Sequence, residues 1–227
     1  MPAGAAPDPE GTPAPAIGRR SRRRRPAAEP RARLAAGFPL PCPAVSQTAC
    51  ASPRWLAPDL LHPAPAAREL DWLNEPGSLT RRLTELGAGR FAVEPLVEGW
   101  QILRDDECAA LGVAPGSEGW VREVYLHGAG QAWVFARSVA ARSALEAQPF
   151  ALDSLGSTSL GHLLFRDPAF TRQPIEACRY PAALLPPAVR AEGLWGRRSL
   201  FCQGALGVLV AEVFLPALWQ ADAATRN

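Results

Sequence analysis

The chain contains no lysine, so all 24 of its basic side chains are arginine guanidiniums. Cysteine and histidine are scarce as well, with five and three residues. The cysteines are widely spaced and include no C-x-x-C pair, which argues against a disulfide framework and against a zinc knuckle. No metal-ligand spacing links the histidines, so we expect no metal site. This cysteine pattern fits a reducing compartment best.

Long apolar runs are also missing. None reaches the roughly 18 to 20 residues that a helix needs to cross a bilayer. The arginine cluster at residues 19–25 is followed by Pro26 and a mixed polar stretch, which lacks the apolar core of a secretory signal. We therefore expect a soluble, cytoplasmic protein. The sequence has no G-x-G-x-x-G, phosphate loop or G-x-S-x-G, which removes the usual dinucleotide, NTP and serine-hydrolase interpretations.

The first part of the chain differs in composition from the rest. Residues 1–50 hold 10 of the 24 prolines, and 8 arginines against 3 acidic residues, without apolar periodicity. Such a segment cannot bury enough surface to offset the entropy of ordering. We predict a disordered Pro/Ala/Arg-rich leader at 1–51 and one domain at 52–227. The arginine cluster could bind nucleic acid electrostatically, but a solvated run of charge is the favoured interpretation, so no nucleic-acid partner is expected.

Apolar residues recur at helical or strand spacing from residue 52 onward. Leucines predict two short helices, with Ser78 as the N-cap of the second and Gly87 as its stop, and a third helix follows at 159–165. A proline-rich surface loop is expected at 180–192. β-Branched and aromatic runs predict strands at 91–93, 120–126, 131–139, 199–201 and 208–215. Tight turns between them imply an antiparallel sheet with helices covering one face, a single α+β domain.

A β-hairpin is predicted around a two-residue turn at 129–130. Positions that sum to 259 then pair, which places Arg122 opposite Arg137 on one sheet face. Two guanidiniums on an otherwise apolar face repel each other and are costly to bury unless something negative lies between them. An anionic ligand could supply that charge. Alternatively, local acids such as Glu94 or Glu98 pair with the arginines, or the arginines reach solvent.

The predicted strand 208–215 also carries a charged residue on an apolar face, in this case a carboxylate. Alternation places Glu212 on a face of apolar residues, where an ionised carboxylate needs a partner. Two explanations stay open: a buried structural ion pair with an arginine, or a ligand pocket with arginine at one end and carboxylate at the other. Two further arginines, Arg197 and Arg198, follow a glycine-rich turn that is by itself typical of an exposed basic turn.

Six segments occur in a characteristic order across about residues 52 to 219. The most specific are Gly-Leu-Trp-Gly-Arg-Arg-Ser at 193–199 and Glu-Val-Phe-Leu-Pro at 212–216. The others are Leu-Asp-Trp-Leu at 70–73, Ser-Leu-Thr-Arg-Arg at 78–82, Val-Arg-Glu-Val at 121–124, and Leu-Gly at 155–156 with Leu-Gly-His-Leu-Leu-Phe at 160–165. Together they make the chain similar to the bacterial chorismate lyase family of ubiquinone biosynthesis.

The resemblance implies a monomeric α+β domain with an antiparallel sheet, a ligand cavity beneath helical flaps and no cofactor. The family's ligand-contacting arginine and glutamate match Arg122 and Glu212. Its two apolar flap contacts fall on Leu79 and Leu160, and Arg137 matches a family arginine near the ligand route. The family often has Met where Leu79 stands, a volume-conserving exchange that should keep the lid apolar.

The implied activity is chorismate pyruvate-lyase, which releases 4-hydroxybenzoate and pyruvate from chorismate. As a hypothesis, Arg122 binds the ring carboxylate by a bidentate contact, Glu212 hydrogen-bonds the C4 hydroxyl as a positioning group or a base, and Arg137 attracts the enolpyruvyl carboxylate. Two alternatives stay open. One is a lyase that gives another aromatic product. The other is a non-catalytic effector-binding domain, although the leader is too proline-rich for the winged helix that such a regulator needs.

Overall fold

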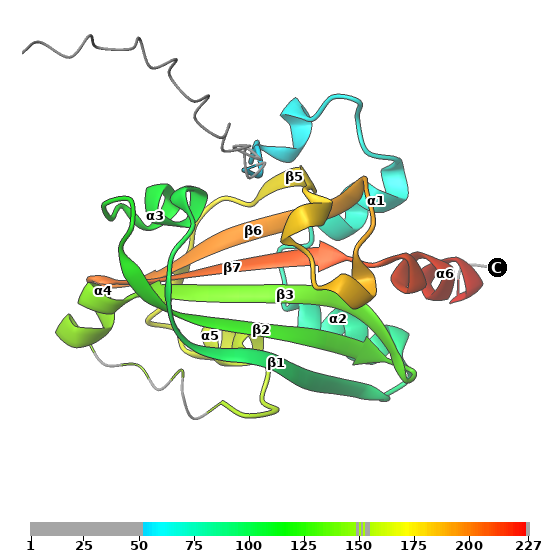
Figure 1. Ribbon diagram of the computed structural model, residues 1–227. Coiled ribbons are helices and arrows are strands. Elements are labelled where there is room, and N and C mark those ends of the chain that lie inside the picture. Colours follow the sequence, from blue (N-terminus) through cyan, green and yellow to red (C-terminus); the bar gives the residue numbers. More distant parts are fainter. Residues whose placement is uncertain (1–51, 149, 151, 153–154, 226–227) are drawn as a thin grey trace, which may run out of the picture. The chain divides into compact units, whose positions relative to one another are not determined.

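A computed structural model describes residues 52–148, 150, 152 and 155–225, and the predicted leader lies outside this part of the chain. Seven strands form one antiparallel sheet in the order β1-β2-β3-β7-β6-β4, and β5 also pairs with β6 (Figure 1). The strands are β1 Phe91–Ile102, β2 Glu118–Gly128, β3 Gln131–Ala141, β4 Thr171–Arg172, β5 Glu176–Tyr180, β6 Leu194–Gln203 and β7 Leu206–Phe214. The α+β class with an antiparallel sheet is confirmed.

Helices pack on both faces of this sheet. We call one the α2 face, which α1, α2 and α5 cover, and the other the α3 face, which α3 and the turns η2 and η3 cover. The helices are α1 Ala67–Leu73, α2 Leu79–Leu86, α3 Asp105–Leu111, α4 Arg142–Ala147, α5 Leu160–Arg166 and α6 Pro216–Thr225, with 3₁₀ turns η1 Pro58–Leu60, η2 Ala182–Leu184 and η3 Pro187–Val189. Helices and 3₁₀ turns therefore cover both faces of the sheet, whereas the sequence predicted helices on one face.

Local signals set the limits of α2 as predicted. The hydroxyl of Ser78 caps the helix by accepting from the Arg81 N–H at 3.5 Å, and Gly87 closes it by donating to the Leu83 carbonyl at 2.9 Å. Leu79 and Leu83 are buried along the helix and pack with residues of β2 in one apolar cluster. The apolar stripe of α2 therefore fixes the helix against the sheet.

The β2–β3 hairpin turns at Ala129-Gly130 as predicted, with φ of 51° and 85° at the two residues. A β-bulge follows at once, with Trp133 as the extra residue between the pairs His127↔Ala132 and Leu126↔Val134. The bulge shifts the register by one residue, and one residue of shift moves side chains to the other face.

The predicted pairing of Arg122 with Arg137 is therefore wrong. Arg122 lies opposite Ser138 on the α2 face, and Arg137 lies opposite Glu123 on the α3 face. The bulge has a packing reason: the Trp133 ring is buried directly against Gly128, where an added Cβ would lie 1.9 Å from a ring carbon. Trp133 and Val134 consequently both enter the core of the α2 face.

The predicted surface loop at 180–192 is ordered into η2 and η3. Leu185 between them is 2% exposed and packs with Tyr125 and Phe135 over the α3 face. The strand predicted at 199–201 begins already at Leu194, so the arginines of the supposed exposed turn lie inside β6. No helix of the described residues is long and apolar enough to cross a membrane.

Candidate functional site

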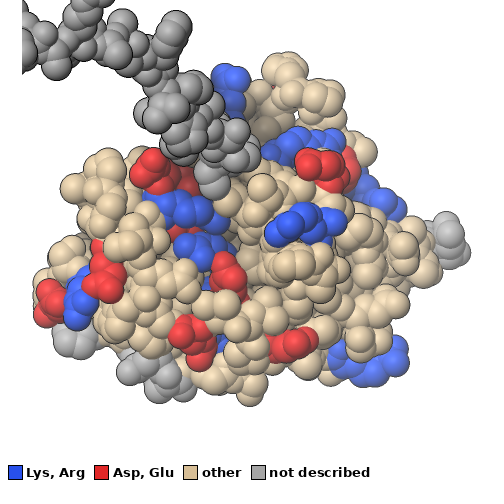
Figure 2. Space-filling view, in the orientation of Figure 1, with Lys and Arg blue, Asp and Glu red and all other residues tan. Residues whose placement is uncertain are grey.

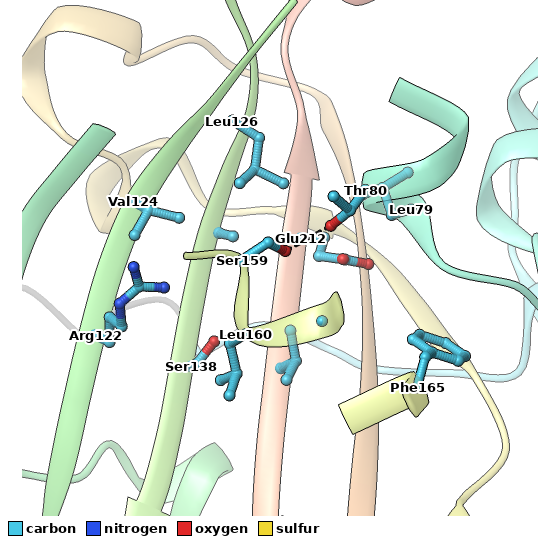
Figure 3. Close-up of a pocket in the computed structure, with 13 residues that line it drawn as sticks. Leu79, Thr80, Arg122, Val124, Leu126, Ser138, Ser159, Leu160, Phe165 and Glu212 are labelled. Atoms are coloured by element: carbon cyan, nitrogen blue, oxygen red, sulfur yellow. Dashed lines mark hydrogen bonds between the residues drawn. The ribbon is translucent and has the colours of Figure 1, made fainter. Parts of the chain in front are cut away.

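A small pocket of about 30 Å³ lies between α2, α5 and the α2 face of the sheet (Figure 3). Its wall is apolar except at a few positions, which is typical of sites that orient a small organic ligand. The apolar lining is Leu79, Val124, Leu126, Ala136, Leu160, Gly161, Phe165 and Val210. The polar lining is Thr80, Arg122, Ser138, Ser159 and Glu212.

Arg122 reaches the pocket from β2, and its side chain is 2% exposed. Its Nε donates to Glu98 Oε1 at 2.6 Å, and its Nη2 donates to the carbonyls of Gly156 at 2.5 Å and Thr158 at 3.2 Å. Among the described residues, Nη1 has no acceptor. The predicted pairing with Glu98 is confirmed, yet two N–H groups of the guanidinium stay available to a ligand.

Glu212 lines the same pocket from β7. Arg197 lies opposite it on β6, and Arg197 Nε donates to Glu212 Oε2 at 2.8 Å. Arg197 is 1% exposed, and its Nη1 also donates to the carbonyls of Trp72 and Glu75, both at 3.0 Å. The ion pair that the sequence left open as one explanation is thus present, and Glu212 also lines a pocket that Arg122 enters from the other end. Within the described residues Oε1 has no donor.

Arg122 and Glu212 stand at two ends of the pocket floor. β3 lies between their strands, where Ser138 pairs with Arg122 and Ala136 pairs with Glu212. Two strand spacings amount to about 10 Å between the backbones, and in Figure 3 the carboxyl group of Glu212 is directed away from Arg122. Ala136 and the hydroxyl-bearing Ser138 lie on the floor between them. A ligand with a carboxylate at one end and a hydroxyl at the other matches this arrangement.

A lid closes over the floor from two helix starts. Leu79 is the first residue of α2 and Leu160 the first of α5, and each follows a serine at the N-cap position. Both leucines are almost fully buried, so the two predicted flap residues do meet at the pocket. The hydroxyls of Thr80 and Ser159 are joined by a hydrogen bond of 2.5 Å, the dashed line in Figure 3. This bond ties one half of the lid to the other.

Arg137, the remaining predicted site residue, lies on the α3 face and does not line the pocket. Its Nε and Nη2 donate to the two oxygens of Glu107 at 2.7 and 3.0 Å, and its Nη1 donates to Glu123 at 2.8 Å. Burial alone would lower the pKa of Arg137, but the hydrogen bonds and charges of the two carboxylates raise it above its ordinary value.

Arginines and carboxylates are interleaved over the rest of this face. Arg104, Asp106, Arg198 and Glu176 continue the pairing that starts at Arg137, and Figure 2 shows basic and acidic side chains next to each other instead of in patches of one sign. Within the described part of the chain these groups satisfy each other, and none of their guanidiniums lines the pocket.

Sequence reasoning missed the polar residues of the lid and floor. Thr80 and Ser159 flank the predicted flap leucines, and helix starts favour such residues, but a capping role and a lining role look alike in a sequence. Ser138 was missed because the bulge sets its register. Among the described residues, no group of three or more His, Cys, Asp and Glu side chains is placed to hold a metal ion.

The sequence of this chain is similar to those of known proteins. A family model described as "Chorismate lyase" matches residues 50–224. A protein of Pseudomonas aeruginosa (strain UCBPP-PA14) named "Probable chorismate pyruvate-lyase" is 69% identical over 165 residues, which cover 73% of this chain and 92% of the relative. A protein of Pseudomonas fluorescens (strain Pf0-1) named "Probable chorismate pyruvate-lyase 2" is 64% identical over 170 residues, or 75% and 93% of the two chains.

Solved structures give a weaker likeness. The effector domain of PhnF from Mycobacterium smegmatis has a TM-score of 0.42 at 12% identity and covers 62% of this chain and 90% of its own. The ligand-binding domain of a GntR-family transcriptional regulator from Bordetella bronchiseptica has a TM-score of 0.41 at 12% identity, covering 56% and 84%. Likeness at this level says nothing about function.

Proposed function

The chain belongs to the chorismate lyase family, and from that premise we propose that its pocket converts chorismate into 4-hydroxybenzoate and pyruvate, the first committed step of ubiquinone biosynthesis. The observation that carries the proposal is the pair Arg122 and Glu212 at two ends of one apolar, lidded pocket. Chorismate carries a ring carboxylate at C1 and a hydroxyl at C4, across the ring. The pocket offers one group for each.

Arg122 binds the ring carboxylate. The Nη1 hydrogens, which have no acceptor among the described residues, supply the first contact with the carboxylate. A bidentate contact through Nη1 and Nη2 requires the carbonyl of Gly156 or Thr158 to give up its hydrogen bond. Charge-assisted hydrogen bonds of this kind are about twice as strong as neutral ones, so the ligand displaces the weaker carbonyl contact. Glu98 meanwhile keeps the guanidinium oriented.

Glu212 binds the C4 hydroxyl through Oε1, since Oε2 is engaged by Arg197. The ether bond at ring C3 then breaks, the hydrogen at C4 leaves, and the ring becomes aromatic. The departing enolpyruvyl group gains that hydrogen and leaves as pyruvate, so all atoms are accounted for without a further reactant. Aromatisation drives the reaction, and the main work of the protein is to hold chorismate in a reactive conformation.

The lid excludes water from the reacting ring. Leu79 and Leu160 cover the pocket, and with water excluded the polar contacts of Arg122 and Glu212 become stronger. We expect the Thr80–Ser159 hydrogen bond to open when the product leaves, so this bond slows product release.

The protein acts as a monomer in the cytoplasm under this proposal. The described cysteines, Cys108, Cys178 and Cys202, are free thiols, as a reducing compartment requires.

The proposal is tested by incubating the purified protein with chorismate alone. The expected result is equal release of 4-hydroxybenzoate, followed by chromatography and absorbance, and of pyruvate, followed by a coupled assay. A different aromatic product would replace the proposal with another chorismate lyase activity. Binding of chorismate without any product would replace it with an effector-binding role.

A further inference from the structure

Arg172 on β4 lies at the Glu212 end of the pocket. Its Nε donates to the hydroxyl of Ser199 at 2.9 Å, and its guanidinium carbon lies 5.3 Å from the ring centre of Phe165, a residue of the pocket wall. Ser199 lies on β6 two residues after Arg197, so alternation puts both on the α2 face. The guanidinium of Arg172 is therefore close to the pair Arg197–Glu212.

The charges at this end of the pocket do not balance. Arg197 already engages Glu212, and no ion pair joins Arg172 to a carboxylate among the described residues. Burial first, and then the positive charge of Arg197, lowers the pKa of Arg172. The charge of the Glu75 carboxylate raises the pKa of Arg172, but this carboxylate is already engaged by Arg82 at 3.1 Å and by the Gly77 N–H at 2.9 Å. Two guanidiniums facing one carboxylate leave a surplus positive charge that an anion would stabilise.

Arg172 also has donors to spare. Its Nη1 donates to the carbonyls of Pro76 at 2.9 Å and Glu75 at 3.3 Å, and Nε is taken by Ser199. Within the described part of the chain, Nη2 has no acceptor. A guanidinium held rigidly through Nε and Nη1, with Nη2 left over, is oriented for one more acceptor.

We propose that Arg172 binds the carboxylate of the enolpyruvyl group of chorismate, an inference that rests on the proposed function. The enolpyruvyl ether is attached at C3, next to the C4 hydroxyl, so binding of that hydroxyl by Glu212 brings the enolpyruvyl group to the same end of the pocket. Its carboxylate supplies the missing negative charge. The sequence had assigned this task to Arg137, which lies on the other face of the sheet.

This role should affect the binding of substrate and the binding of product differently. 4-Hydroxybenzoate has lost the enolpyruvyl group, so it interacts with Arg122 and Glu212 but leaves Arg172 unused. Loss of Arg172 should therefore weaken the productive binding of chorismate and spare the affinity for 4-hydroxybenzoate.

A purely structural role predicts a different result. Through Nη1, Arg172 also holds the α1–α2 connection, which leads into the lid residue Leu79. Arg82 holds the same connection: its Nη1 donates to the Asp71 carbonyl at 2.8 Å and to Glu75 at 3.1 Å, and its guanidinium stacks on Trp72. The variant Arg82→Gln thus loosens this segment without removing a charge next to Glu212, and serves as the matched control.

The experiment measures kcat/KM for chorismate and the inhibition constant of 4-hydroxybenzoate for wild type, Arg172→Gln, Arg172→Lys and Arg82→Gln. Arg172→Gln should lower kcat/KM about 30-fold or more and change the inhibition constant less than about twofold. Arg172→Lys, which keeps the charge but loses the fixed planar fork, should recover part of the loss. Arg82→Gln should shift the two constants together.

Proportional changes of kcat/KM and product affinity in Arg172→Gln would overturn the inference in favour of a lid-holding role. Unchanged kcat/KM in a folded Arg172→Gln protein would overturn it as well. If Arg172→Gln does not fold, Arg172→Lys decides, because the inference requires kcat/KM to fall in that variant while product affinity stays. Absence of turnover in the wild type would instead refute the proposed function itself.

Discussion

Arg197 and Glu212 form an ion pair across β6 and β7, with Nε and Oε2 2.8 Å apart, and this pair sets one end of the pocket. The guanidinium is almost completely buried and is anchored by the carbonyls of Trp72 and Glu75. Glu212 therefore presents a fixed oxygen, Oε1, to the ligand. Because the carboxylate is already held in one orientation and is partly exposed, it can bind a hydroxyl without a further loss of its own conformational entropy.

The Arg197–Glu212 pair should contribute to stability. Arg197→Met should lower the free energy of unfolding by about 3 kcal/mol, because it removes the one cation in direct contact with Glu212 among the described residues and leaves the carbonyls of Trp72 and Glu75 without this donor. The double variant Arg197→Met/Glu212→Met should recover much of that loss. Urea denaturation measures both. A double variant as unstable as the sum of the two single variants would contradict the prediction.

The lid bond between Thr80 and Ser159 should control product release. Thr80→Val keeps the shape of the side chain and removes its hydroxyl, at a cost of about 1 kcal/mol for one hydrogen bond. Dissociation of 4-hydroxybenzoate should become about fivefold faster, as measured by stopped flow. Ser159→Ala should have the same effect, and the double variant should add little. An unchanged dissociation rate in both single variants would show that another step limits release.

Arg137 should matter for stability through Glu107 on the α3 face. Glu107 is 2% exposed, so Arg137→Met leaves a buried carboxylate short of its main partner and should cost about 3 to 5 kcal/mol of unfolding free energy. The matched control is Arg142→Met, since Arg142 pairs with Glu146 at 3.1 Å in an exposed site, where the loss of an ion pair changes stability little. Similar losses in the two variants would contradict the burial argument.

The thiol of Cys178 should be unreactive in the folded protein. Burial raises its pKa to about 12, from an ordinary value of 9.0. Thiolate therefore forms in the unfolded chain above pH 9 but not in the folded one, so the stability contributed by the neutral thiol is complete below pH 9 and is lost as the pH rises toward 12. Alkylation at pH 9 with peptide mapping should label the partly exposed Cys202 and spare Cys178. Equal labelling of the folded protein at both thiols would contradict this.

The sequence predicted the fold and both ends of the pocket because those features depend on local signals. Alternation along the strand placed Glu212 on the pocket face, and the serine and glycine around α2 placed Leu79 at a helix start. The wrong pairing of Arg122 with Arg137 has one cause: the bulge at Trp133, which depends on a tertiary contact with Gly128 and cannot be predicted from the two-residue turn. The same one-residue shift concealed Ser138.

Arg172 and Arg197 were not predicted as site residues for a different reason. Both are held in place by contacts with the α1–α2 connection, about 100 or more positions away in the sequence. A run such as Gly-Leu-Trp-Gly-Arg-Arg-Ser reads locally as a basic turn, and only the pairing of β6 with β7 turns its first arginine toward Glu212. The balance of charges at the pocket can therefore be determined only from the tertiary structure, not from the sequence.

The most direct test of the account compares the affinities of 4-hydroxybenzoate and benzoate, measured by calorimetry, in the wild type and in Glu212→Ala. If Arg122 binds the carboxylate and Glu212 the hydroxyl, the wild type should bind 4-hydroxybenzoate at least about tenfold more tightly, as a hydrogen bond to a charged group provides. That preference should vanish in Glu212→Ala and persist in Arg122→Met, with both ligands weakened in the latter. Equal affinities in the wild type, or a preference that survives the loss of Glu212, would contradict the assignment of these two residues to the two ends of the ligand.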